Sequence, residues 1–390
     1  MQVNQVYELM NTITQEILGE SVIVQEDLSN VVELGEAFEN AGGLDNFVRS
    51  LNDHIGRVIF VNRVYGGRAP SVLMDGWEFG SVLEKLRANL PAATENESWE
   101  LSDGMSYDPN VFYKPSISVK FWNSKVTFEI PISLTERQVK SAFSNATQLN
   151  AFLSMIETAI QNAMTVKLDA LIMRTINAGI GETLADAFPN ADYGDSSTTR
   201  AVNLLYLYNT TYNAGGSPLA AADALSSADF LRFASYQLML YSDRLEVISK
   251  LFNIEGTDKF TPKSRQKVVM LSEFKRAADV YLQSDTFHNE LTRFPAADSV
   301  TYWQGSGTGY AFADTSSINI KTPAGDTVEA SGILGVIFDR DALGVANLDR
   351  RVTTNYNAKA EFWNQWHKMD AGYFLDESEN MVVFYVADAT

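Results

Sequence analysis

The feature that most constrains this chain is the stretch from Leu134 to Ala178, which contains no proline or glycine and follows a helical pattern throughout. One helical face gathers apolar side chains at positions i, i+4, i+7, i+11 and i+14: Leu149, Leu153, Ile156, Ile160 and Ala163. A continuous helix from Leu149 to Ala178 would be about 45 Å long, well above the usual length. The sequence therefore predicts a spine-like helix.

The ends of this helix carry recognisable signals. Ser133 or Thr135, with Glu136 and Gln138, is expected to cap its N-terminus. Polar and β-branched residues at 145–147 allow a break there, which would leave a short leading helix and then the long one. Gly179 and Gly181 are expected to end it.

An alternating segment precedes the helix and predicts a β-hairpin. Ile117, Val119 and Phe121 alternate with other side chains, and a second alternating run follows the turn at Asn123-Ser124. Pro131 confines the second strand to a sheet edge or ends its pairing. Because an isolated two-stranded hairpin is marginal in water, its apolar face needs a surface, either its own body or another subunit.

The segments before the hairpin are less regular. Residues 1–48 contain nine acidic residues and no Lys or Arg, and form an arm that packs either on its own domain or over a neighbouring subunit. Arg57–Tyr65 predicts a strand, and the segment "GWEFGSVLEKLRANLP" predicts a short helix. The polar segment Ala92–Pro115 predicts a loop.

After the long helix, strand-like and helical pieces mix. Helices are expected over Thr198–Tyr212 and Ser227–Phe252, and strands over Lys267–Leu271, Ile333–Phe338 and Met381–Val386. The pieces lack a regular strand–helix–strand alternation, which argues against a Rossmann or TIM arrangement. The predicted fold class is α+β.

Charge and composition exclude several functions. The chain has 30 Lys and Arg against 49 Asp and Glu, a formal net charge of −19, so it is not expected to wrap nucleic acid by phosphate neutralisation. It has no Cys, so thiolate metal sites and Cys nucleophiles are impossible. The N-terminus lacks the basic region of a signal peptide, and no apolar run is long enough to span a bilayer. We expect folding in the cytoplasm and no membrane partner.

No catalytic, cofactor or metal site is predicted. The glycines of "GSGTG" (305–309) lack the spacing of a phosphate-binding loop, and the three histidines, His54, His288 and His367, are scattered. Asp339 and Asp341 would suit a hard cation or acid–base work, but a charge-balanced turn with Arg340 is favoured. The aromatic residues near the C-terminus, Trp363, Trp366, Tyr373 and Phe374, are expected in a core or a subunit contact.

The hairpin and helix together resemble the major capsid protein of tailed bacteriophages, whose fold is shared with the herpesvirus capsid floor and with encapsulins. "WELSDGMSYDPNVFYKPSISVKFWNSKVTFEIPISLTERQVKSAF" resembles that family's extended loop, and "NAFLSMIETAIQNAMTVKLDALIMRTINAGIG" resembles its spine helix. Two further segments, "SADFLRFASYQLMLYSDRLEVISKLFN" and "ILGVIFDRDALG" onward, resemble capsid proteins of small short-tailed phages.

The resemblance implies a series of parts along the chain. They are the N-terminal arm (1–60), a strand and short helix of the arm or peripheral region (61–94), the extended loop (95–133), the spine helix and peripheral domain (134–200), the axial domain (201–335) and a return to the peripheral and axial sheet (336–390). Expected subunit contacts are Lys120, Phe121, Trp122, Lys125, Phe128 and Arg137.

The implied function is that of a structural shell subunit, not an enzyme. It would assemble as pentamers and hexamers, in the host cytoplasm, into the icosahedral head of a double-stranded DNA phage. A separate scaffolding protein and a portal are the implied partners, and the DNA is enclosed without sequence-specific binding. An encapsulin-like compartment is the alternative, and an acidic α+β hydrolase using Asp339 and Asp341 is the rival from another class.

Overall fold

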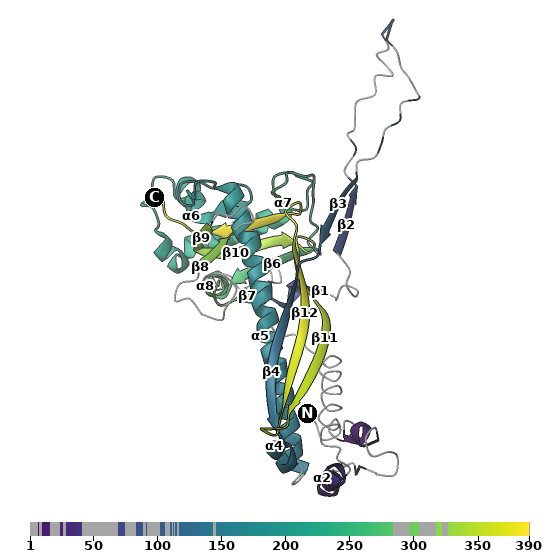
Figure 1. Cartoon of the computed structure of the whole chain (residues 1–390). Helices are drawn as coiled ribbons and strands as arrows, with labels where there is room; N and C mark the ends of the chain where they lie inside the picture. Colours follow the sequence, from purple (N-terminus) through teal and green to yellow (C-terminus); the bar gives the residue numbers. More distant parts are fainter. Residues whose placement is uncertain are drawn as a thin grey trace.

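The computed structural model is elongated, with one long helix running along most of its length (Figure 1). It describes residues 10–15, 24–25, 29–40, 69–74, 83–88, 102–105, 117–142, 146–283, 297–303, 317–321 and 327–389, and the single residues 7, 91, 110, 112 and 114. Two sheets lie along this helix, one at its lower half and one at its upper half in the view of Figure 1. A two-stranded ribbon projects beyond the upper sheet.

The long helix is α5, Ala146–Ala187, preceded by the short helix α4, Glu136–Ala142. The predicted spine is confirmed. Of the predicted break at 145–147, residues 146 and 147 lie within α5, and residue 145 lies outside the described residues. Thr135 caps α4 as expected: its Oγ1 accepts from the Gln138 backbone N at 3.3 Å, and its backbone N donates to Gln138 Oε1 at 3.0 Å. This reciprocal capping box satisfies two backbone N–H donors at the helix start.

The expected stop at Gly179 and Gly181 is wrong, because α5 continues through both glycines for about two and a half more turns, to Ala187. A Cβ added at Gly179 would lie 2.9 Å from Met381 Sδ, and one at Gly181 would lie 3.2 Å from Ile320 Cβ. The two glycines therefore permit close packing on the upper half of the helix.

The lower sheet has the strand order β1-β11-β12-β4. Its strands are β1 (Leu73–Met74), β4 (Lys125–Thr135), β11 (Leu343–Asn357) and β12 (Phe362–Leu375). β11 and β12 form a long antiparallel hairpin, and β4 pairs with β12 as the edge strand. Pro131 lies within β4, so the edge position predicted from this proline is confirmed.

The predicted hairpin of 117–132 is wrong in its pairing. Its first strand, β3 (Ile117–Trp122), pairs antiparallel with β2 (Leu83–Ala88), while its second strand, β4, pairs with β12. The short helix expected around Leu83 and Leu86 is also wrong, because this segment is β2. Tertiary pairing overrides both local patterns, and β2 with β3 forms the projecting ribbon (Figure 1).

The upper sheet has the order β5-β13-β10-β6-β7 and forms the most buried part of the fold. Its strands are β5 (Ala201–Asn203), β6 (Gln266–Leu271), β7 (Asp298–Val300), β10 (Ile333–Asp339) and β13 (Met381–Tyr385). Every residue of β10 and β13 is buried, so these two predicted strands are confirmed. The small pair β8 (Ser317–Lys321) and β9 (Thr327–Ser331) packs on α5.

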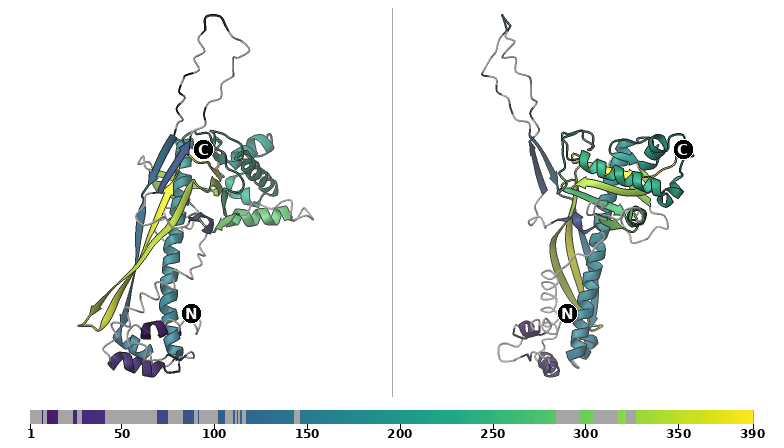
Figure 2. Two further views of the ribbon diagram at one scale, coloured as in Figure 1. Left: turned by 90° about the vertical axis from the view of Figure 1, so that its right-hand side faces the viewer. Right: turned by 180° about the vertical axis from the view of Figure 1, so that it is seen from behind.

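Helices cover the upper sheet, as the rear view in Figure 2 shows. They are α6 (Leu204–Leu207), α7 (Ala228–Arg244) and α8 (Ser272–Gln283), with short turns at Pro70–Val72, Tyr208–Tyr212 and Ala221–Ser226. Ser227 caps α7, whose helix ends at Arg244 rather than at Phe252. The helix expected from Thr198 begins only at Leu204, because 201–203 joins the sheet as β5.

The described part of the N-terminal arm packs on its own chain. Helix α2 (Val31–Asn40) lies at the end of α5 opposite the upper sheet (Figures 1 and 2). Met10, Ile13 and Phe38 are fully buried in the same apolar core as Leu149 of α5. Of the two placements expected for the arm, these residues show the one on its own chain.

Candidate assembly interface

The β2–β3 ribbon has two chemically different faces. Its cross-strand register sets Lys85 opposite Lys120 and Leu83 opposite Trp122, which places these four residues on one face. The other face carries Leu86 opposite Val119, with Phe121 and Ile117 beside them along β3. We call the first the inner face, because it contacts the body, and the second the outer face.

The inner face is bound to an acidic loop between β12 and β13, which we call the acidic loop (residues 376–380). Lys85 Nζ lies 2.6 Å from Asp376 Oδ2 and 2.5 Å from Glu379 Oε1. Lys120 Nζ lies 2.8 Å from Asp376 Oδ1 and also pairs with Glu255. Asp376 thus receives one ribbon lysine on each of its carboxylate oxygens.

Other contacts complete the junction between ribbon and body. The indole Nε1 of Trp122 donates to the Leu375 carbonyl oxygen at 3.1 Å, and its ring packs on Phe374 with centroids 5.5 Å apart. Arg87 donates to the Asp258 carbonyl oxygen at 3.3 Å. The base of the ribbon therefore rests on the end of β12 and on the segment around 255–258.

The acidic loop is itself held in place. The Asp376 side chain is completely buried, and its Oδ1 accepts from Ser378 N at 3.1 Å and Ser378 Oγ at 2.7 Å. Burial alone would raise the pKa of Asp376, but hydrogen bonds from Lys120, Lys85 and Ser378 outweigh it and lower the pKa to about 2. Asp376 is a fixed anion at any ordinary pH.

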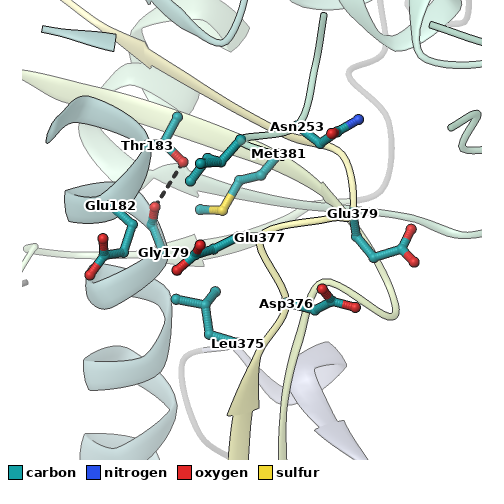
Figure 3. A pocket seen from close by; sticks show the side chains of 10 residues that line it. Gly179, Glu182, Thr183, Asn253, Leu375, Asp376, Glu377, Glu379 and Met381 are labelled. Atoms are coloured by element: carbon teal, nitrogen blue, oxygen red, sulfur yellow. Dashed lines mark hydrogen bonds between the residues drawn. The ribbon is translucent and has the colours of Figure 1, made fainter. Parts of the chain in front are cut away.

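A pair of carboxylates lies beside this loop, in a pocket lined by α5 and residues 375–381 (Figure 3). Glu182 projects from α5 toward this pocket, and Glu377 belongs to the acidic loop. Burial, together with repulsion from Glu377, raises the pKa of Glu182 to about 6. The two carboxylates, Glu182 and Glu377, repel each other across this pocket.

The outer face of the ribbon is exposed and largely apolar, with one charged residue, Glu84, opposite Phe121. The exposed fractions of its side chains are 68% for Leu86, 63% for Ile117, 62% for Phe121 and 42% for Val119. Singly exposed apolar residues are ordinary, but four on one face of a projecting ribbon form a candidate docking surface.

The six residues expected at subunit contacts fall into two groups. Phe121, Lys125 and Arg137 are exposed. The other three contact their own chain: Lys120 in the ion pairs above, Trp122 on Phe374, and Phe128 against the main core. Their part in contacts between subunits stays a prediction.

Sequence reasoning missed Lys85, Leu86, Asp376 and Glu379. The segment "LEKLRA" (83–88) lacks a period-2 pattern, so nothing local marks Lys85 and Leu86 as facing opposite sides of a ribbon. The acids of 376–379 do form a local cluster in the sequence. Their partners on the ribbon, Lys85 and Lys120, lie more than 250 residues earlier in the chain.

The chemical candidates from the sequence have structural explanations. The Asp339 side chain accepts from the Asp341 backbone N at 2.9 Å, and Arg265 pairs with both carboxylates. This is the expected charge-balanced turn, but the balancing cation is Arg265 rather than Arg340. His367 is buried, and burial together with Arg350 lowers its pKa to about 4.

The remaining candidates are settled in part. Trp363 and Phe374 are buried and Trp363 packs on Tyr356 with ring centroids 5.0 Å apart, as expected of an aromatic core. His54, His288, the "GSGTG" glycines and Arg57–Tyr65 lie outside the described residues. Among the residues described, no cluster of His, Asp and Glu is arranged to hold a metal ion, and none of the helices could cross a membrane.

Comparison with known proteins gives one family and a set of similar structures. The family model described as "Phi29-like phage major capsid protein" matches residues 10–385. A search of curated proteins found no match. The capsid structure of Staphylococcus phage Andhra has a TM-score of 0.50 at 11% identity, over 83% of this chain and 86% of that chain.

A second similar chain comes from "Structure of head fiber and inner core protein gp22 of native bacteriophage P68". It has a TM-score of 0.51 at 11% identity, over 83% of this chain and 86% of that chain. At this identity, the two structures show a shared fold.

Proposed function

Since the chain belongs to the Phi29-like phage major capsid protein family, it is a structural shell subunit of a phage head, and we propose that it assembles as pentamers and hexamers into an icosahedral shell. The family match extends over nearly the whole chain, and the fold is shared with phage capsid structures. The subunit is accordingly part of the virion.

The observation that carries the proposed mode of assembly is the two-faced ribbon. Its inner face is bound to its own body by Lys85 and Lys120, so only its outer face is left for a neighbour. Burying apolar surface stabilises a contact by roughly 25 cal/mol per Å². The proposed occupant of the outer face is a second copy of this chain, because a closed shell is built from repeated contacts of one subunit type.

Further partners follow from the proposal. Assembly in the host cytoplasm would use a separate scaffolding protein and a portal, and the finished shell would enclose double-stranded DNA. The net charge of −19 supports enclosure without sequence-specific binding, since few cations are available to neutralise phosphates. We assign the subunit no enzymatic activity. The rival hypothesis, a hydrolase, would use Asp339 and Asp341, but both carboxylates are ion-paired with Arg265.

The family match does not favour the encapsulin-like alternative. The two functions differ in content and attachments: a phage head holds DNA and carries a tail, whereas an encapsulin holds protein cargo. Electron microscopy of native particles distinguishes them directly. Tailless, protein-filled particles would overturn the phage-head proposal.

The test of the proposed contact uses one substitution on the outer face. Val119→Asp places a charge among Leu86, Ile117 and Phe121, and desolvating this charge in a subunit contact is costly. We expect a folded subunit, with an unchanged circular dichroism spectrum, that forms at least about tenfold fewer shells in the presence of scaffold. Normal shells would contradict the proposed contact.

The matched control is Val280→Asp. Val280 is also an exposed valine, at 65%, but it lies on α8 and away from the ribbon. We expect shells from this variant in near-normal yield, counted by negative-stain microscopy and sedimentation. An equal loss in both variants would mean that the effect is not specific to the ribbon.

A further inference from the structure

The ribbon brings two like charges directly opposite each other. Lys85 of β2 and Lys120 of β3 are cross-strand partners on the inner face. Like charges in this arrangement destabilise a two-stranded pairing, and a two-stranded ribbon is marginal by itself. The ribbon therefore needs an anion at this point in order to stay paired.

Asp376 supplies this anion from the body. Its Oδ2 lies 2.6 Å from Lys85 Nζ and its Oδ1 lies 2.8 Å from Lys120 Nζ, so a single carboxylate bridges the two strands. Glu379 and Glu255 add one further carboxylate to each lysine. Hydrogen bonds to charged groups are stronger than neutral ones, especially where a partner is buried, as the Asp376 side chain is.

The direction of this carboxylate is also fixed. The Asp376 backbone N donates to the Ala342 carbonyl oxygen at 2.7 Å, which ties the acidic loop to the start of the long β11–β12 hairpin. Ser378 holds the side chain through its N and Oγ. An anion held by its own backbone and by Ser378 is oriented by the body rather than by the lysines.

From these contacts we propose that Asp376 is the positioning residue of the ribbon: it bridges Lys85 and Lys120 and thereby sets the direction in which the free subunit presents the outer face to a neighbour. The inference deepens the proposed function and rests on it for the role of the outer face. The bridge itself is a property of the single chain and is tested on unassembled protein.

The test is hydrogen–deuterium exchange of the unassembled full-length chain, read by mass spectrometry, for the wild type and Asp376→Asn. The amide is neutral but keeps the size of the carboxylate and can still accept from Ser378. We expect exchange in peptides covering β2 and β3 to rise by about tenfold or more, while peptides of β10 and β13 are unchanged. Unchanged exchange of the ribbon in a folded variant would overturn the proposal.

The matched control is Asp370→Asn. Asp370 lies on β12, close in sequence to Asp376, and pairs with Arg351, with Nη1 and Oδ2 2.5 Å apart, but it contacts no residue of the ribbon strands that the structure describes. We expect ribbon exchange like that of the wild type. An equal rise in this variant would assign the effect to general loosening of β12 and would overturn the positioning role.

A second variant covers the case in which Asp376→Asn does not fold. This variant is Lys120→Gln. Lys120 is partly exposed on the ribbon, and its replacement leaves Asp376 with the Lys85 ion pair and the Ser378 hydrogen bonds. We expect a smaller rise in ribbon exchange and a weaker dependence of that exchange on added salt than in the wild type. No change in either quantity would overturn the proposal.

The two proposals fail separately. If Val119→Asp forms normal shells while Asp376→Asn loosens the ribbon, the bridge stands and the outer face is not the contact. If Val119→Asp blocks shells while Asp376→Asn leaves ribbon exchange unchanged, the outer face is the contact and the bridge does not position it.

Discussion

A side chain at Gly179 of α5 would put its Cβ 2.9 Å from the sulfur of Met381, at the start of β13. Leu375 Cδ1 is the next neighbour, at 3.2 Å. This glycine is therefore the place where the long helix approaches both the end of β12 and the start of β13. The contact gives a packing reason for a glycine inside a helix, where its propensity is low.

We predict that a small residue at this position changes the unfolding free energy little and that a large residue lowers it substantially. Gly179→Ala gains about 1 kcal/mol of helix propensity and displaces only the flexible end of Met381, so the unfolding free energy should change by less than about 1 kcal/mol. Gly179→Leu overpacks the site and should destabilise by about 2 kcal/mol or more. Chemical denaturation measures both.

The control for helix propensity is Ala159→Leu, at an exposed position of the same helix. A leucine there should change the unfolding free energy by less than about 0.5 kcal/mol. If Gly179→Leu is tolerated as well as Ala159→Leu, Met381 and Leu375 do not restrict the space at Gly179.

His367 should make the fold sensitive to mild acid. Burial and the nearby Arg350 lower its pKa to about 4, from the ordinary histidine value of about 6.5, so the folded state holds the imidazole neutral. The unfolded state then binds more protons as the pH falls from about 6.5 to 4, and stability is lost over that range. Between pH 7 and pH 5 the loss attributable to His367 should be about 2 kcal/mol.

The variant that checks this is His367→Gln, which cannot gain a charge. Its unfolding free energy should fall less between pH 7 and pH 5 than that of the wild type. His54 and His288 are present in both proteins, so the difference isolates His367. Parallel losses in the two proteins would show that His367 does not carry the acid sensitivity.

Glu182 should act in the reverse direction. Burial and repulsion by Glu377 raise its pKa to about 6, so the folded state binds a proton more tightly than the unfolded state does. Stability therefore falls as the pH rises from about 4.5 to 6, and the penalty persists above that. Glu182→Gln should raise the unfolding free energy at pH 8 by up to about 1 kcal/mol, after allowance for solvent screening.

Thermal unfolding at pH 8 and pH 4 reads out this effect, which should vanish at pH 4. Glu377→Gln removes the repelling partner, so the gains of the two substitutions should be less than additive. A Glu182→Gln variant that is less stable than the wild type at pH 8 would contradict the assignment.

The capping box at the start of α4 should be measurable as a coupled pair. Thr135→Ala should cost about 1 kcal/mol of unfolding free energy, because Gln138 N loses its acceptor. Gln138→Ala removes the reciprocal bond to Thr135, whose backbone N then loses its partner. A double-mutant cycle in urea should give a combined loss smaller than the sum, and simple additivity would argue against the box.

Several elements could be predicted from local sequence because one pattern dominates them. The apolar face of Leu149 to Ile160 determines the start of α5, and the continuous apolar runs of β10 and β13 identify them as buried strands. The edge position of Pro131 also follows from local chemistry. In each case, the side chains near in sequence suffice.

The β11–β12 hairpin shows why other elements were missed. Every second residue from Trp363 to Ala371 is buried, but these include Gln365 and His367, so the hydrophobic alternation typical of a strand is obscured. Ribbon strand β2 has no such alternation at all. The local pattern of its partner β3 instead predicts pairing with β4, the next strand in the sequence. Pairing with strands distant in the sequence decides both the formation of β12 and the pairing of β2 with β3.

The sequence by itself determined the long helix, the buried strands, the α+β class and the acidic charge of this capsid subunit, because these depend on residues close together in the chain. Only the tertiary structure decided which strand joins β3, and hence which face of the ribbon stays exposed. The physical reason is that Lys85, Lys120 and Asp376 stabilise the junction only when the fold brings them together.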